Sequence, residues 1–329
     1  MDGNYYLYGS HSNISLAQNN VMTVQNQSLV QGNNGIKLSE EEKTRNQKLL
    51  DLYRNTTKAY FFNKTLLVNG NPCRIGEVEF YQAGDPFIHK DPHQLTFNCF
   101  RFHRAGDQTK VKKKNEGVSR YKNGTYKGLD ITIGAQPDFY GGLLVRSILT
   151  PQGFIEGPCK VVDYILNTCG FPSIDALVDH LLILGQQQGI KEPIPCDFEN
   201  PLLKIVSANY QETPIYNGPR VGLTLKKEKY VMGPRCQYIM KPYRFTCFPA
   251  ILKIDRHMLV VQARFNQIPD DTIIRDFNLQ QGLLYKWVSH FIKGKTMICE
   301  FFLTPENSKL DKVAIQLNCL GFFTNLDGY

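Results

Sequence analysis

The residues best suited to chemistry lie between positions 76 and 89. The stretch Gly-Glu-Val-Glu-Phe-Tyr at 76–81 alternates apolar and polar side chains as a half-buried strand does, which places Glu79 and Tyr81 on one face. His89 follows after a short turn that contains Gly, Asp and Pro. A carboxylate, an aromatic ring and an imidazole brought together can hold a flat heterocycle and activate a water molecule beside it. An ordinary strand with a polar outer face fits the same residues, so the choice depends on the rest of the chain.

Helices and short strands would position these side chains. Cap and breaker residues predict helices that begin near Ser39, Pro158 and Ser173, and a helix that ends at Gly294. Alternating apolar residues predict strands over 65–68, 73–81, 129–133 and 142–148, and in the C-terminal part over 245–254, 259–265, 297–303 and 313–320. The first two of these strands are expected to form a hairpin around Asn69, Gly70 and Asn71. Because strands and helices mix without βαβ regularity, the expected fold class is α+β, with a mixed, mainly antiparallel curved sheet and flanking helices.

The composition divides the 329 residues into three parts. Residues 1–36 are rich in Asn and Gln and have no apolar period, so we expect a disordered tail. Residues 37–245 are expected to form the domain that carries the site. Residues 246–329 are expected to form a β-rich C-terminal extension, packed on this domain or continuing it.

Positive charge is concentrated in two basic segments. Residues 101–127 carry nine Lys or Arg against two acids, residues 220–244 carry seven against one, and the whole chain has a net charge of +8. Such segments are typical of a surface that binds a polyanion, although solvated loops have the same composition.

The location expected from the sequence is intracellular and soluble. The N-terminus lacks the basic and apolar regions of a signal peptide, and no apolar run is long enough to cross a membrane. The nine cysteines include no CxxC pair, which is typical of reduced thiols. We therefore expect no membrane partner.

Several segments together resemble a known family. These are Ala-Tyr-Phe-Phe-Asn-Lys-Thr-Leu-Leu-Val at 59–68, Arg-Ile-Gly-Glu-Val-Glu-Phe-Tyr at 74–81, Gly-Leu-Leu-Val-Arg-Ser-Ile at 142–148, Gly-Pro-Cys-Lys at 157–160, and Pro-Arg-Val-Gly at 219–222 with Lys-Pro-Tyr-Arg-Phe at 241–245. Their order resembles that of the alkyladenine (3-methyladenine) DNA glycosylase family, over residues 55–245. The last 84 residues lie outside the resemblance.

The resemblance implies a monofunctional DNA glycosylase of base-excision repair, nuclear if the source is eukaryotic. In such enzymes a water molecule attacks C1′ of a flipped-out damaged nucleotide. Glu79 would be the general base, Arg146 would help to position the water, and Tyr81 and His89 would stack on the base. The partner would be damaged DNA, duplex or single-stranded, bound by a monomer without cofactor or metal. The basic residues expected to contact the nucleic-acid backbone are Lys112, Lys113, Lys114, Lys160 and Arg220.

Two departures from the family affect the expected substrate. The family's tyrosine-rich strand pair, which wedges into the duplex, has no clear copy, and a basic stretch at 110–127 stands in its place. Asp130 stands where the family carries an asparagine that discriminates between purines. An ionised aspartate offers acceptors only, so it would favour bases that carry an amino group or a positive charge. The alternative is that Asp130 pairs with a lysine or arginine of the basic segment and never meets a base.

Three other interpretations remain open. His89, His93, Cys99 and His103 lie within fifteen residues, as zinc ligands can, but the paired-Cys signal of a zinc site is missing. The chain would otherwise be a non-catalytic nucleic-acid-binding protein on the same scaffold. Lastly, it would be an N-glycoside hydrolase acting on RNA, single-stranded DNA or nucleosides. The sequence does not identify the base that is removed.

Overall fold

The structure is a computed structural model that describes residues 40–88, 90–106, 119–135 and 139–327. The predicted disordered tail, residues 1–36, lies outside the described residues, as does the predicted Ser39 cap. The first described element is helix α2 (Glu40–Phe62), which agrees with the helix predicted to follow Ser39.

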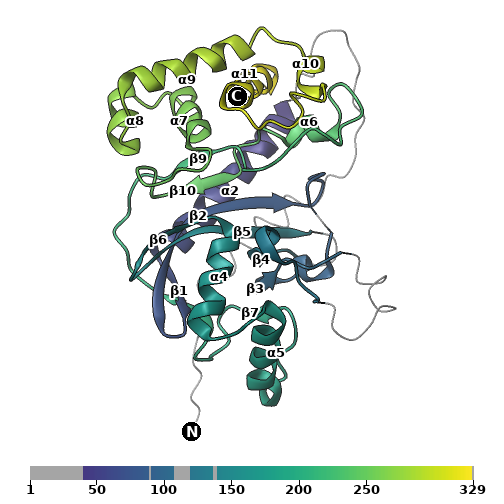
Figure 1. Cartoon of the computed structure of the whole chain (residues 1–329), viewed down its shortest axis with the longest axis vertical. Helices are drawn as coiled ribbons and strands as arrows, with labels where there is room; N and C mark the ends of the chain where they lie inside the picture. The colour runs from purple at the N-terminus through teal and green to yellow at the C-terminus, as the bar shows by residue number, and fades with distance from the viewer. Residues whose placement is uncertain (1–39, 89, 107–118, 136–138, 328–329) are drawn as a thin grey trace.

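A ten-stranded antiparallel sheet forms the centre of the protein (Figure 1). Its strands are β1 (Lys64–Val68), β2 (Asn71–Gln82), β3 (Phe97–Phe102), β4 (Leu129–Ile133), β5 (Gly141–Thr150), β6 (Gly153–Glu156), β7 (Ile194–Pro195), β8 (Leu203–Ser207), β9 (Tyr216–Gly218) and β10 (Arg244–Thr246). The main path runs β7-β3-β4-β5-β2-β1-β8, while β10 pairs with β2 and β9, and β6 pairs with β5. The α+β class with a mainly antiparallel sheet and flanking helices is confirmed.

The hairpin between β1 and β2 forms at the predicted position. Val68 pairs with Asn71, and the two residues between them, Asn69 and Gly70, have φ of 47° and 76°. A two-residue hairpin turn needs such positive φ values, which Asn and Gly adopt at low cost. The turn therefore fixes the register of β2.

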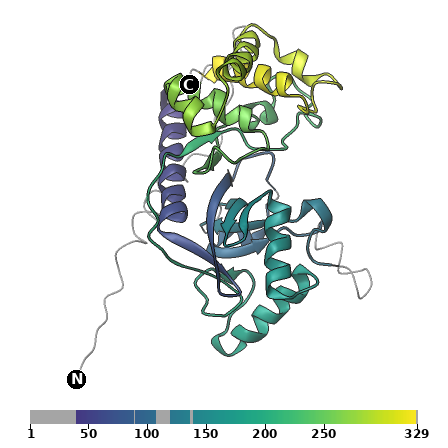
Figure 2. The same ribbon diagram turned by 60° about the vertical axis from the view of Figure 1, so that its left-hand side comes forward.

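Helices cover both sides of the sheet. Figures 1 and 2 show α2 and α4 (Pro158–Cys169) on opposite sides. The ring of Phe80 in β2 stacks on Tyr53 of α2 with centroids 4.2 Å apart, so the apolar face of β2 packs toward α2. The opposite face of β2 is left for its polar side chains.

Two further helix boundaries agree with the sequence. Gly170, with φ of 75°, ends α4 in the left-handed conformation. The Ser173 hydroxyl accepts a hydrogen bond from the Ala176 N–H at 3.2 Å and caps α5 (Ile174–Gly185).

The pairing of β2 with β5 is interrupted by one unpaired residue on each strand, and these two residues lie close to each other along the ladder. Ile75 pairs with Ile148, Glu77 with Ser147 and Val78 with Val145, so Gly76 on β2 and Arg146 on β5 have no direct partner across the ladder. A bulge of this kind redirects a side chain relative to the regular pleat. A Cβ on Gly76 would lie 2.5 Å from the Phe248 ring, so this position requires glycine.

The C-terminal part is helical, which corrects the prediction of a β-rich extension at 246–329. It contains α7 (Arg256–Phe265), α8 (Asp270–Phe277), α9 (Gln281–Gly294), α10 (Cys299–Leu303) and α11 (Val313–Asp327), preceded by the short α6 (Pro234–Tyr238). Of the strands predicted there, only a short piece at 245–246, at the end of β10, forms. The runs predicted as strands at 259–265 and 313–320 belong to α7 and α11, in which long stretches are buried on every side. A helix that is apolar all round shows no 3.6-residue period, and a short apolar run then resembles a buried strand.

The C-terminal helices gather at one end of the molecule (Figure 1). Their cores include residues that precede position 246, namely Tyr216, Leu225 and Cys236. The C-terminal part therefore shares its packing with the rest of the protein. In the part of the chain that the structure describes, no helix combines the length and the apolar character needed to cross a membrane.

Candidate functional site

Glu79 lies in the middle of the sheet with its carboxylate almost fully buried. It is 5% exposed and pairs with Leu144 of β5 on one side and Arg244 of β10 on the other. One carboxylate oxygen accepts a hydrogen bond from the Val221 N–H at 2.6 Å. The other lies 3.4 Å from Nη1 of Arg146. Glu79 and Arg146, both named from the sequence as site residues, are therefore in contact.

Glu77 extends this contact into a cluster of two acids and two arginines. Its Oε1 accepts hydrogen bonds from Nε of Arg146 at 3.3 Å and from Nε of Arg244 at 2.5 Å. Arg244 also donates to the carbonyl groups of Ile254 and Asp255, at 2.8 and 3.2 Å. Burial alone would lower the pKa of Arg146, but the nearby carboxylates of Glu79 and Glu77 raise it. The four charges balance within the buried sheet.

Tyr81 projects from the same face as Glu79. The ladder between β2 and β5 is regular from Val78 to Gln82, so side chains two residues apart share a face. The Tyr81 ring lies over Gly142, where a Cβ would overlap its hydroxyl group. The glycine thus makes room for the ring, and the Tyr81 hydroxyl donates a short hydrogen bond to Asp130.

Asp130 is fully buried, at 0% exposure, and its carboxylate has three partners. Besides the Tyr81 hydroxyl, it contacts Nη1 of Arg101 at 2.7 Å and Nε2 of His103 at 3.1 Å. Burial alone would raise the pKa of Asp130, but the charges and hydrogen bonds of His103 and Arg101 lower it to about 2. The carboxylate is therefore ionised at neutral pH.

These contacts correct the prediction that Asp130 binds the base. The carboxylate is enclosed and pairs with Arg101, an arginine of the basic segment, which is the alternative that the sequence left open. A buried carboxylate needs such a partner, since an unpaired buried charge is costly. Asp130 positions Tyr81 instead.

Arg220 is likewise a buried residue rather than a surface contact for phosphate. Its side chain is 5% exposed, its Nη1 lies 2.6 Å from Asp85, and the rings of Phe87 and Tyr243 flank its guanidinium group. The prediction that Arg220 contacts the nucleic-acid backbone is therefore wrong, because its side chain is buried and its charge is paired with that of Asp85. The next residue, Val221, contributes to the site through its backbone N–H.

The remaining predicted site residues are placed in different ways. His89 and the lysines Lys112, Lys113 and Lys114 lie outside the described residues. Lys160 is exposed in the first turn of α4. Its contact with a nucleic-acid backbone remains a prediction.

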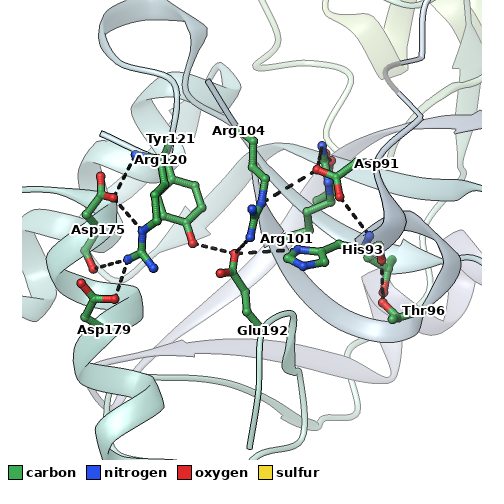
Figure 3. A network of polar contacts seen from close by, with 12 residues as sticks. Asp91, His93, Thr96, Arg101, Arg104, Arg120, Tyr121, Asp175, Asp179 and Glu192 are labelled. Atoms are coloured by element: carbon green, nitrogen blue, oxygen red, sulfur yellow. Dashed lines mark hydrogen bonds and ion pairs between the residues drawn. The ribbon is translucent and has the colours of Figure 1, made fainter. Parts of the chain in front are cut away.

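Other cations of the first basic segment are held by acids (Figure 3). Arg101 contacts Asp91 at 3.0 Å as well as Asp130, and Arg104 contacts Glu192 at 2.5 Å. Arg120 lies 3.0 Å from Asp175 and 2.5 Å from Asp179, while Lys127 pairs with Asp163. These four cations therefore stabilise the fold, and the free charge of the segment must come from other residues.

The histidines and the cysteine considered as zinc ligands do not converge where they are described. His103 contacts Asp130, whereas His93 lies 3.8 Å from Glu192. Among the described residues, no group of three or more His, Cys, Asp or Glu side chains is arranged to hold a metal ion.

Sequence reasoning missed Glu77, Arg244, Arg101 and His103 as parts of the site. One signal was present for Glu77, which lies two residues before Glu79 and so shares its face. The arginines and His103 come from other strands or from the residue that follows one, and only the pairing of the sheet brings them to these carboxylates.

Comparison with known proteins finds a viral relative. The chain is 33% identical over 220 residues to an uncharacterized protein, L759, of Acanthamoeba polyphaga mimivirus, and the match covers 61% of this chain and 88% of the viral protein. No protein-family model matches the chain, and no solved structure matches it.

Proposed function

We propose that this chain, which belongs to the same family as the mimivirus protein L759, is a monofunctional N-glycosylase that removes a damaged, alkylated purine from DNA. One observation carries the proposal. Glu79, Arg146 and Tyr81, chosen from the sequence for this chemistry, lie on neighbouring strands with Glu79 and Tyr81 on one face and Glu79 in contact with Arg146.

In the proposed reaction a water molecule attacks C1′ of the flipped-out nucleotide. Its oxygen forms a bond to C1′ while the bond from C1′ to the base nitrogen breaks, and the base leaves with the electron pair of that bond. The proton of the water passes to the Glu79 carboxylate. Arg146 and the Val221 N–H each contact one oxygen of this carboxylate, which fixes its direction.

Tyr81 would form one wall for the extruded base. Its hydroxyl bonds to Asp130, which Arg101 and His103 hold in turn, so the ring has a fixed orientation over Gly142. A rigid aromatic surface stacks on a base without losing further freedom on binding.

The test is base release from defined duplexes. The purified protein is incubated with duplexes that hold hypoxanthine, ethenoadenine, 3-methyladenine or 7-methylguanine, and alkali-labile sites are counted. We expect release by the parent chain and a loss of about 10²–10⁴-fold in Glu79→Gln, because the amide cannot accept the proton. Glu212→Gln, in an exposed loop, is the matched control and keeps the parent rate. Equal rates in parent and Glu79→Gln would refute the role of Glu79.

A second candidate, an N-glycoside hydrolase that acts on single strands, RNA or nucleosides, is favoured by one observation. Arg101, Arg104, Arg120 and Lys127 are engaged by acids and so contribute little free charge for a duplex. Parallel incubations with single-stranded DNA, RNA and free nucleosides separate the candidates. Release from these substrates alone would favour the second.

A further inference from the structure

A compact loop at 225–233, which we call the Tyr230 loop, precedes α6. Its acidic residue, Glu228, accepts hydrogen bonds from the backbone N–H groups of Tyr230 and Arg235, at 3.1 and 2.8 Å. The Gly233 N–H donates to the Tyr230 carbonyl at 3.0 Å. The carboxylate of Glu228 lies where a Cβ on Gly233 would be, so the glycine leaves room for this carboxylate. The Glu228 carboxylate therefore holds the backbone of the loop in place.

This arrangement leaves only positive charge on the outside of the loop. Lys226, Lys227 and Lys229 are exposed. The ion pairs between described residues involve none of these three lysines. They differ in this respect from Arg101, Arg104 and Arg120, whose charges are neutralised. The loop thus supplies cations that are not neutralised by acids, unlike the three arginines of the first basic segment.

Apolar side chains project between these lysines. Tyr230 is 70% exposed and Val231 is 51% exposed. Ile298, 63% exposed, lies beside them because the Met232 N–H contacts the Cys299 sulfur at 3.5 Å. An aromatic ring and a branched aliphatic side chain exposed on this loop, with Ile298 from the start of α10 beside them, indicate a binding surface.

The loop is connected to the site that contains Glu79. The segment that leads into it begins at Val221, whose N–H holds the Glu79 carboxylate. At its other end, the Arg235 guanidinium lies 4.7 Å from the Phe87 ring and donates to the Pro86 carbonyl at 3.5 Å. Pro86 and Phe87 follow Tyr81 by only a few residues, so the loop flanks the turn that leaves the catalytic strand.

We propose that the Tyr230 loop is a contact surface for duplex DNA. Its lysines bind phosphates, and Tyr230 inserts at an unstacked base step beside the nucleotide held at Glu79. The inference rests on the proposed function for the identity of the polymer. Charge complementarity supports it, since lysines bind phosphates and an exposed ring can enter a base step. A membrane surface would call for a larger apolar area than these few side chains provide.

The experiment measures DNA binding and base unstacking without using catalysis. A labelled duplex carries 2-aminopurine, which becomes more fluorescent when it is unstacked, next to a 7-methylguanine. Binding is followed by anisotropy at several salt concentrations. The variants are Tyr230→Ala, Tyr230→Phe, and the triple change of Lys226, Lys227 and Lys229 to Ala. Tyr285→Ala on α9, where the tyrosine is 50% exposed, is the matched control.

We expect Tyr230→Ala to weaken binding between about 5-fold and 150-fold and to abolish the 2-aminopurine signal, since stacking on one ring contributes about 1–3 kcal/mol. Tyr230→Phe and Tyr285→Ala keep both properties. The triple lysine variant lowers the salt slope by up to about 0.9 for each phosphate that is no longer neutralised. Unchanged affinity and signal in Tyr230→Ala would overturn the inference, as would Tyr230-dependent binding to phosphatidylserine vesicles in place of DNA.

The outcomes separate this inference from the proposed function. Binding that depends on Tyr230, without base release by the parent chain, would refute the glycosylase and keep the loop as a DNA contact. Base release that is unchanged in Tyr230→Ala would keep the glycosylase and refute the role of the loop. A parent chain that binds no DNA would refute both.

Discussion

The burial of Glu77 has a large expected effect on stability. It is completely buried, and its charge is balanced by Arg146 and Arg244. Removing one partner of a buried ion pair leaves an uncompensated charge, which costs about 3–5 kcal/mol. Replacing both partners with apolar side chains avoids that cost. The two cases can be distinguished by mutation.

We therefore expect Arg244→Met to lower the free energy of unfolding by about 3–5 kcal/mol, because Glu77 keeps a single, longer contact to Arg146. In the double variant Arg244→Met, Glu77→Leu, part of this loss should be recovered. Urea unfolding of the two single variants and the double variant measures the coupling. Strictly additive losses would mean that the two residues do not act as a pair.

Asp130 makes the fold sensitive to acid. Its pKa of about 2 in the folded chain lies below the ordinary value of 3.8, so the carboxylate stabilises the fold above pH 4. This stabilisation, about 2 kcal/mol, is lost as the pH falls from about 4 to 2. Asp130→Asn should lower the free energy of unfolding at pH 7 and flatten its decline in that range. Asp51→Asn, at an exposed position, should change neither. An unaltered acid profile in Asp130→Asn would contradict the role given to this carboxylate.

Among the elements, β5 accommodates Tyr81 through a glycine. Gly142→Ala should push the Tyr81 ring off the strand and break its bond to Asp130, with a loss of about 1–3 kcal/mol from overpacking. Gly282→Ala in α9 is the control, because a Cβ there meets nothing within 4 Å. Thermal unfolding of both variants tests this, and an unchanged melting temperature in Gly142→Ala would count against the placement of the ring.

The basic segment at 101–127 leads to a prediction for its lysines. Because Arg101, Arg104 and Arg120 are paired with acids, Lys112, Lys113 and Lys114 should carry the share of electrostatic binding that this segment contributes. Changing these three to Ala should weaken binding to all DNA sequences alike and lower the salt slope by up to about 0.9 for each phosphate that they neutralise. A salt slope equal to that of the parent would mean that the three lysines face only solvent.

The elements also explain what the sequence can and cannot predict. The alternation at 76–81 and the Asn-Gly turn at 69–70 are local signals, and both are confirmed. The sequence pattern predicts strands where α7 and α11 lie, because burial on every side removes the helical period. The pairing of Asp130 with Arg101 depends on the register of β3 and β4, which no local pattern reveals. Contacts between strands that are distant in the sequence are therefore what local sequence patterns mainly fail to predict.

At the scale of the whole molecule, the helical end and the sheet share their cores. Tyr216 of β9 packs among the C-terminal helices, and Arg244 of β10 bonds to both Glu77 and the chain just before α7. We therefore expect one cooperative thermal transition. Calorimetry would show equal calorimetric and van 't Hoff enthalpies. Two separate transitions would show that residues 246–329 fold as an independent unit.

The two unpaired residues Gly76 and Arg146 make the strand pairing of the sheet independent of the cation that contacts Glu79. Without these two residues, Ile75, Glu77 and Val78 would face Ile148, Ser147 and Val145 in an unbroken ladder, with every side chain on its present face. The sheet does not need Arg146 for its pairing. A gene that lost the codons for Gly76 and Arg146 would keep its reading frame. The encoded chain would keep the strand register, yet it would lack the cation beside Glu79. Gain or loss of the proposed activity would then be a matter of two matched single-residue insertions or deletions. The strand register would be inherited unchanged, while Glu77 and Glu79 would each have one buried partner fewer.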